Sequence, residues 1–104
     1  MRIPIACTLT SQSAAARLEE WRSFFAQSID VAERVDDVHL RVRLNGSTED
    51  LEAAVDLARR EKVCCAFFVF SIEVEADASW LSVTVPPDAA EILAGFVSLL
   101  PQRL

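Results

Sequence analysis

Residues 38–75, VHLRVRLNGSTEDLEAAVDLARREKVCCAFFVFSIEVE, contain the clearest structural pattern of the chain, because a strand, a turn, a helix and a second strand follow one another there without a long loop. Apolar residues occupy every second position of 38–44, and the alternation returns in 68–74. This period of two is typical of a strand with one apolar face and one polar face. The stretch therefore predicts an α+β protein in which helices cover one face of a sheet.

The segment between these two strands reads as an amphipathic helix. Ser47 is the expected N-cap, and Glu49 and Asp50 fall in the first turn, where carboxylates interact favourably with the helix dipole. The apolar stripe of this helix is expected to be Leu51, Ala54, Val55 and Ala58. The helix leads directly into the adjacent cysteines Cys64 and Cys65.

The rest of the chain adds elements on both sides of this stretch. Before it we expect a strand over 2–10, with Cys7 on its apolar face, a helix over 14–29, and a strand over 31–35 that turns at Asp36. After it we expect a strand over 80–85 and a helix over 88–100, opened by a capping box of Asp88 and Glu91. The apolar stripe of the 14–29 helix is expected to contain Leu18, Trp21, Phe25 and Ile29.

The resulting order, β-α-β-β-α-β-β-α, begins like a ferredoxin-like split βαβ fold. We therefore expect a two-layer α+β sandwich, ferredoxin-like β-α-β-β-α-β with an added C-terminal strand and helix, in a single domain over 1–104. The length of 104 residues suits one hydrophobic core, and 52% hydrophobic with 25% charged residues is ordinary for a compact protein.

Charge and hydropathy bear on partners and location. A net charge of -6 disfavours nucleic-acid binding, since the phosphate backbone is also negative. No apolar run is long enough to cross a membrane, and the first residues are too quickly polar for a signal peptide. We therefore expect a cytoplasmic protein with reduced thiols, and three cysteines, an odd number, do not form a closed disulfide framework.

The cysteines have two readings. Buried cysteine often packs as a small hydrophobic residue, and Cys7 and Cys65 both fall on expected apolar faces. However, Glu61, Cys64 and Cys65 lie at i, i+3 and i+4, which places their side chains on one helix surface. In a ferredoxin-like sheet the end of the first strand meets the start of the fourth, so Cys7 would join them.

The charge at this place favours an ion over covalent chemistry. A helix C-terminus carries a negative dipole end, which disfavours a nucleophilic thiolate, and Glu61 adds a carboxylate. Soft thiolates select soft metals, and three sulfurs suit trigonal species such as mercury(II) or arsenic(III). Zinc normally takes four ligands, so Glu61 or His39 would have to complete its site. The leading hypothesis is thus a thiophilic metal or metalloid site of Cys7, Cys64, Cys65 and Glu61.

Two alternatives remain open at the level of sequence. The chain could be a non-catalytic interaction or accessory domain whose cysteines only fill the core. It could also be a thiol redox protein in which Cys64 is nucleophilic and Cys65 resolves the mixed disulfide. No dinucleotide-binding, phosphate-loop, nucleophile-elbow or zinc-protease motif is present, so the sequence leaves open whether the protein is an enzyme. Oligomeric state is equally open.

Three short motifs resemble those of a small, uncharacterised bacterial domain family: IACTLT at 5–10, EWR at 20–22, and E-x-x-C-C-x-F-x-x-F from Glu61. The last is similar to segments associated with mercury-responsive regulators of the MerR type. The resemblance implies a soft-metal connection for Glu61, the two adjacent cysteines and Cys7. This chain departs from the pattern at Ala66, where the resembled segments have proline, so the turn after the thiols is expected to be less fixed.

Overall fold

The computed structural model describes residues 11–101, with the side chains of 11–14 and of Cys64 left aside. The elements follow one another in this order: α1 (Ser11–Ser28), β1 (Ile29–Asp36), β2 (His39–Leu44), α2 (Thr48–Cys64), β3 (Val69–Val74), β4 (Ser79–Thr84), a 3-10 turn η1 (Pro87–Ala89) and α3 (Ala90–Val97). The strand expected over 2–10, and Cys7 with it, lies outside the described residues.

The described strands form one antiparallel sheet in the order β1-β2-β4-β3. This order differs from the ferredoxin-like one, in which the N-terminal strand would separate β2 from the strand after α2. Here β4 takes that place, because it turns back from β3 as a hairpin and then pairs along its whole length with β2. The expected α+β class is confirmed, and the expected strand order is not.

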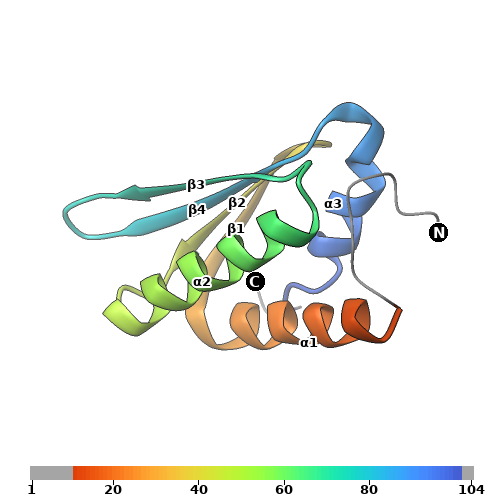
Figure 1. Ribbon diagram of the computed structural model, residues 1–104. Helices are drawn as coiled ribbons and strands as arrows, with labels where there is room; N and C mark the ends of the chain where they lie inside the picture. The colour runs from red at the N-terminus through yellow and green to blue at the C-terminus, as the bar shows by residue number, and fades with distance from the viewer. Residues whose placement is uncertain (1–10, 102–104) are drawn as a thin grey trace.

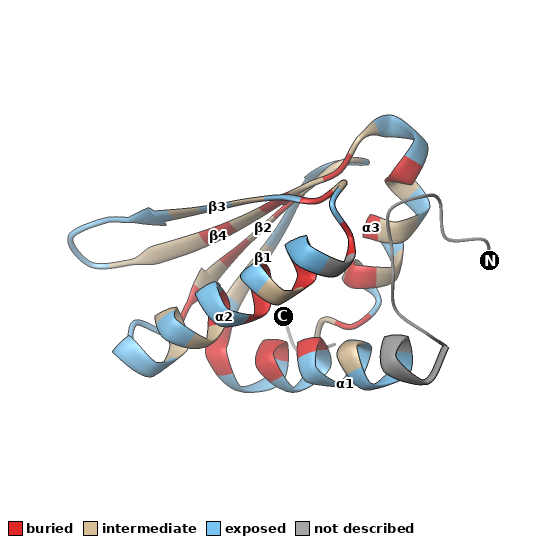
Figure 2. Cartoon of the chain, viewed as in Figure 1, coloured by how far each residue is buried: buried red, intermediate tan, exposed pale blue. Residues whose placement is uncertain are grey.

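The helices lie on one side of the sheet, with α1 and α2 packed next to each other and α3 near the end where β3 begins (Figure 1). Figure 2 shows buried positions on the helix surfaces that face the sheet and on alternate positions of the strands. This two-layer arrangement follows from the period of two in the strands, which gives each of them one apolar face. The largest fully buried side chains are Trp21, Phe25, Phe68, Ile29, Leu40, Leu81, Leu93, Val42 and Val83.

Several local predictions hold. Ser47 caps α2, its side chain accepting a hydrogen bond from the Asp50 backbone N–H at 3.1 Å. Asp36 closes the β1–β2 turn, where its carboxylate accepts from the Val38 N–H at 2.9 Å. Both are short-range interactions, so the local sequence specifies them.

Other local predictions are wrong in detail. Leu18 and Val55, which were expected on apolar helix stripes, are 45% and 40% exposed, and Val74, expected inward, is 70% exposed. In place of Val55, α2 buries Leu57 beside Ala58. The expected capping box at Asp88 is absent, since residues 87–89 form the 3-10 turn η1 and α3 starts without a side-chain cap.

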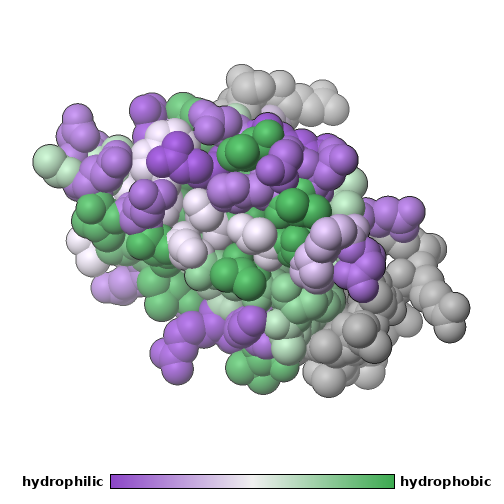
Figure 3. Space-filling model, turned by 90° about the horizontal axis from the view of Figure 1, so that it is seen from above, coloured by the Kyte–Doolittle hydropathy of each residue, from purple (hydrophilic) through white to green (hydrophobic). Residues whose placement is uncertain are grey.

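The second face of the sheet is covered by none of the described helices (Figure 1). The guanidinium of Arg41 stacks 3.9 Å above the Trp80 ring and lies between the carboxylates of Glu33 and Glu73. Seen from above, hydrophilic and apolar side chains are intermingled on this side of the molecule (Figure 3). This face of β2 therefore belongs to a mixed surface on which Arg41 is paired with carboxylates of both β1 and β3.

Replacing Phe25 by alanine should lower the free energy of unfolding by about 3–5 kcal/mol, because a fully buried ring leaves a cavity at the junction of α1 and the sheet. Urea denaturation monitored by circular dichroism measures the loss. Val63→Ala is the control, since Val63 is 81% exposed and its truncation should change stability by less than about 0.5 kcal/mol. Equal losses in the two variants would contradict the described core.

Candidate functional site

Glu61 is a buried carboxylate in the last turn of α2, with only 4% of its surface exposed. Its Oε1 accepts a hydrogen bond from the Trp21 indole Nε1 at 2.8 Å and a longer one from Arg17 Nη1 at 3.4 Å. A carboxylate is expensive to bury unless it is paired and hydrogen-bonded. Arg17 supplies the opposite charge and Trp21 the short hydrogen bond, so both requirements are met from α1.

The two donors reach the same carboxylate because they are four residues apart on α1, and residues at this spacing lie one above the other on a helix. The Trp21 ring is fully buried and contacts Phe25, Phe70 and Phe96, with centroid separations of 5.6, 5.9 and 4.9 Å. Phe70 comes from β3 and Phe96 from α3. Trp21 thus joins the buried carboxylate to the aromatic core.

A second bridge between the two helices lies beside the first and is more exposed. Arg60 Nη2 contacts Glu20 Oε2 at 2.7 Å and Asp56 Oδ2 at 2.9 Å. The hydrogen bond from Arg60 lowers the pKa of Glu20 below its ordinary value of 4.5, against the opposing effect of partial burial. Two adjacent residues of α2 therefore form ion pairs with α1. Arg60 is the cation of one pair, and Glu61 is the anion of the other.

The turn that follows the cysteines is held by Lys62. Its Nζ donates to the carbonyl oxygens of Ala66 at 2.7 Å and Phe68 at 2.6 Å, while the Cys65 N–H donates to the Glu61 carbonyl at 2.7 Å. A lysine near a helix C-terminus often bonds late carbonyls in this way. Lys62 thus supports the turn with two hydrogen bonds at the place where the resembled segments have proline.

Two of the four predicted ligands have side chains in the described part of the chain. Glu61 and Cys65 are both buried, at 4% each, one helical turn apart, and Cys65 belongs to the hydrophobic core cluster. The side chain of Cys64 and all of Cys7 lie outside the described part of the chain. The expectation that Cys7 lies here rested on the ferredoxin-like strand order, which the described sheet does not follow.

His39, considered as a further ligand, lies on the face of β2 that also carries Arg41, opposite Thr84 of β4. Its Nε2 is buried and has no hydrogen-bond partner among the described residues. The helices cover the other face, so His39 does not complete a site with Glu61 (Figure 1). Among the side chains that the structure describes, which do not include that of Cys64, no group of three or more histidine, cysteine or acidic residues could hold a metal ion.

Sequence reasoning missed the roles of Arg17 and Trp21 at Glu61. One signal was present: a tryptophan predicted on the buried stripe of a helix needs an acceptor for its indole N–H. Glu61 was already singled out as a carboxylate on the adjacent helix. A buried indole N–H needs an acceptor and a buried carboxylate needs a donor, so together they indicate a hydrogen bond between Trp21 and Glu61.

Comparison of the chain with protein-family models, with curated proteins and with solved structures found no match. No helix within residues 11–101 is long and apolar enough to cross a membrane.

Trp21→Phe should destabilise the fold by about 2–3 kcal/mol, because it removes the short hydrogen bond to a buried charge while keeping an aromatic ring. Glu61→Gln in the Trp21→Phe background is the informative second variant. A neutral amide at this position costs less to leave without the indole donor, so the double variant should recover part of the loss. Losses that simply add, measured by chemical denaturation, would show that the two residues are not coupled.

Acid should weaken the outer bridge in a defined direction. Because the folded-state pKa of Glu20 is lowered, its pairing with Arg60 contributes stability above the ordinary value of 4.5 and loses it as pH falls through the folded-state pKa. Native protein should therefore lose stability more steeply below pH 4.5 than Glu20→Gln does. Glu52→Gln, at an exposed position of α2, controls for the removal of one charge and should keep the native slope.

Proposed function

We propose that this chain binds a thiophilic metal or metalloid ion at the C-terminal end of α2, through Cys64 and Cys65 with Cys7 as a third thiolate. The observation that carries the proposal is the burial of the Glu61 carboxylate one helical turn before the two adjacent cysteines. Buried ionisable groups with specific charge partners are concentrated at functional sites. Here the burial coincides with the negative end of a helix dipole, which favours a cation.

The hydrogen bonds of Glu61 change its role in the proposal. Its Oε1 is already held by Trp21 and Arg17, so the carboxylate acts as a positioning group that fixes the last turn of α2 against α1. Cys65 follows one turn later and is positioned by the same contacts. Such supporting residues orient the ligands of a metal without touching it.

The class of ion follows from the donor atoms. Thiolates favour soft, polarisable ions, and three of them suit arsenic(III) or mercury(II), whereas zinc needs a fourth ligand. His39 is on the other face of the sheet, and Glu61 is already hydrogen-bonded through Oε1. The proposal therefore gives zinc the lowest rank of the three ions.

A second candidate function rests on a specific observation about Cys65. This residue lies in the core cluster with Phe68 and Phe96, as a packing cysteine does. On this alternative the chain is an interaction or accessory domain, and Cys65→Ala costs on the order of 1 kcal/mol in stability with no effect on any ion.

Titration of the fully reduced protein separates these functions. Arsenite and mercury(II) should each saturate at a single ion per chain in the presence of excess glutathione, with new sulfur-to-metal absorption in the ultraviolet. Cys64→Ser and Cys7→Ser should each abolish arsenite binding, because a trigonal site needs all three sulfurs.

The control is Glu61→Gln, which should retain arsenite binding with reduced affinity, since the proposal makes Glu61 a positioning residue. Circular dichroism of each variant confirms that it is folded. Binding that survives in the Cys7→Ser, Cys64→Ser double variant, or no binding that outcompetes glutathione in the native chain, would sink the proposal and leave the packing function.

A further inference from the structure

We propose that the edge of β3, with which no other described strand than β4 pairs, and the groove between β3 and α2 form a docking site for an extended segment of another protein, rich in acidic and apolar side chains, which joins the sheet as an additional strand. This goes beyond ion binding and does not depend on it. Extended segments commonly bind to exposed sheet edges in this way: backbone hydrogen bonds provide affinity and alternate side chains provide specificity.

The two edges of the sheet are built differently. On β1 the pairing with β2 is irregular between Ile29 and Val31 and again between Arg34 and Asp36, and half of the side chains of the strand are charged. Bulges and charges are the usual devices by which proteins keep an edge strand from pairing with another chain. The β1 edge is therefore protected.

The β3 edge lacks these devices. Its register with β4 is continuous from Val69 to Val74, and the strand contains no lysine, no proline and a single charged residue, Glu73. Val69 and Val74, at its two ends, are 54% and 70% exposed. Since evolution normally covers or disrupts such an edge, its regular and apolar character indicates that something pairs with it.

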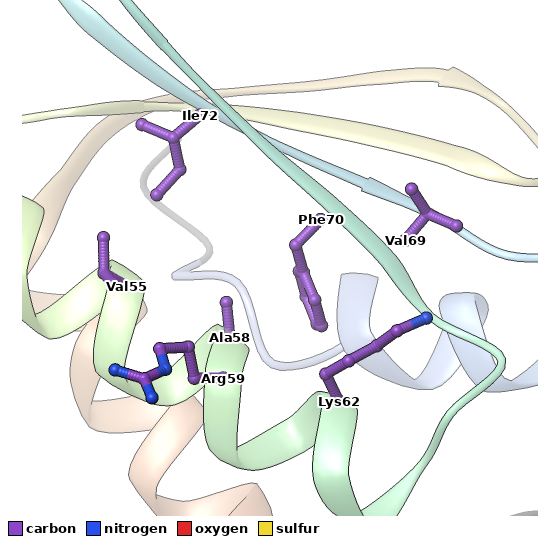
Figure 4. A pocket seen from close by; sticks show the side chains of 7 residues that line it. All are labelled: Val55, Ala58, Arg59, Lys62, Val69, Phe70 and Ile72. Atoms are coloured by element: carbon purple, nitrogen blue, oxygen red, sulfur yellow. The ribbon is translucent and has the colours of Figure 1, made fainter.

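A groove of about 560 Å³ runs along this edge between β3 and α2. Phe70 and Ile72 point from β3 toward the helix, and Val55 and Ala58 point from α2 toward them (Figure 4). A strand added beside β3 would place every second side chain above this apolar floor. The exposure of Val55, which is unexpected for a helix stripe, is explained if the incoming segment covers it.

The charged residues that line the groove are both basic, Arg59 and Lys62, on a chain whose net charge is -6. The Lys62 ammonium is already bonded to the carbonyls of the turn before β3, and Arg59 has no ion-pair partner among the described residues. A carboxylate on the incoming segment would pair with Arg59 at the rim. This local charge is opposite to that of the whole protein, which makes the docking segment acidic.

The same charges argue against a second copy of this chain as the occupant. Two β3 strands paired about a two-fold axis would form one continuous sheet, with both α2 helices on the same face. The Arg59 and Lys62 side chains of the two copies would then line one shared groove, where like charges oppose association. These charges therefore favour a segment of a different protein over a second copy of this chain.

Selection from a phage-displayed library of random peptides about twelve residues long tests the proposal with the full chain as bait. The enriched peptides should carry net negative charge with apolar residues at alternate positions. In fluorescence anisotropy with the best of these peptides, Arg59→Glu should weaken binding on the order of tenfold. Chemical-shift changes on binding should be confined to β3 and the facing surface of α2.

Arg34→Glu is the matched control, because it makes the same charge change at an exposed position of the opposite edge strand and should leave peptide affinity unchanged. Val69→Lys places a charge at the open edge and should weaken binding, whereas Val35→Lys on β1 should not. No enrichment of acidic peptides, or equal loss in Arg34→Glu and Arg59→Glu, would overturn the proposal. A stable dimer that Val69→Lys dissociates would overturn it in favour of a second copy.

Discussion

The hydrogen bond from the Trp21 indole to the buried Glu61 carboxylate is the interaction on which the rest of the structure depends. It connects the two helices below the sheet, and the same tryptophan ring packs against side chains from β3 and α3. A buried carboxylate tolerates few geometries, since its charge must be compensated at short range. The pair therefore sets how α2 lies on α1, whereas apolar contacts alone would permit neighbouring arrangements.

The polar contacts around this pair connect α2 to two different parts of the structure. Glu61 and Arg60 hold α2 to α1, and Lys62 holds the turn that leads into β3. Three consecutive side chains of α2 thus determine the position of the cysteines that follow and the point at which β3 begins. Exposed ion pairs contribute little to stability individually, so the inner, buried contact dominates the energetics and the outer ones add orientation.

The proposed functions use different parts of this arrangement. Ion binding would use the C-terminal end of α2, where a carboxylate and a cysteine are buried together. Docking would use the side of α2 that faces β3, which presents Val55 and Arg59. Lys62 contacts both places, because it fixes the turn after the cysteines and also lines the groove. An ion bound at Cys64 and Cys65 would therefore lie close to the residues that shape one end of the docking groove.

Residues with short-range roles were predictable from their local pattern. The Ser47 cap, the Asp36 turn and the alternation in β2 depend on neighbours within a few positions, so the sequence predicts them directly. The helix stripes were predictable only in part: Trp21 and Phe25 are buried as expected, but Leu18 and Val55 are exposed. Periodicity indicates the direction of a buried face, whereas the width of that face depends on which elements cover it.

Periodicity and capping predict the α+β class, the order of the helices and strands within residues 11–101, and the burial of one face of β2 and of β4. Long-range packing places β4 between β2 and β3, bonds Glu61 to Trp21 and Arg17, and leaves β3 at an edge of the sheet that the described strands form. The difference arises from the sequence separation over which each effect acts. Propensity, capping and periodicity act over one or two turns of chain, while strand order and the partner of a buried charge are selected by competition among residues some forty positions apart, as between Trp21 and Glu61.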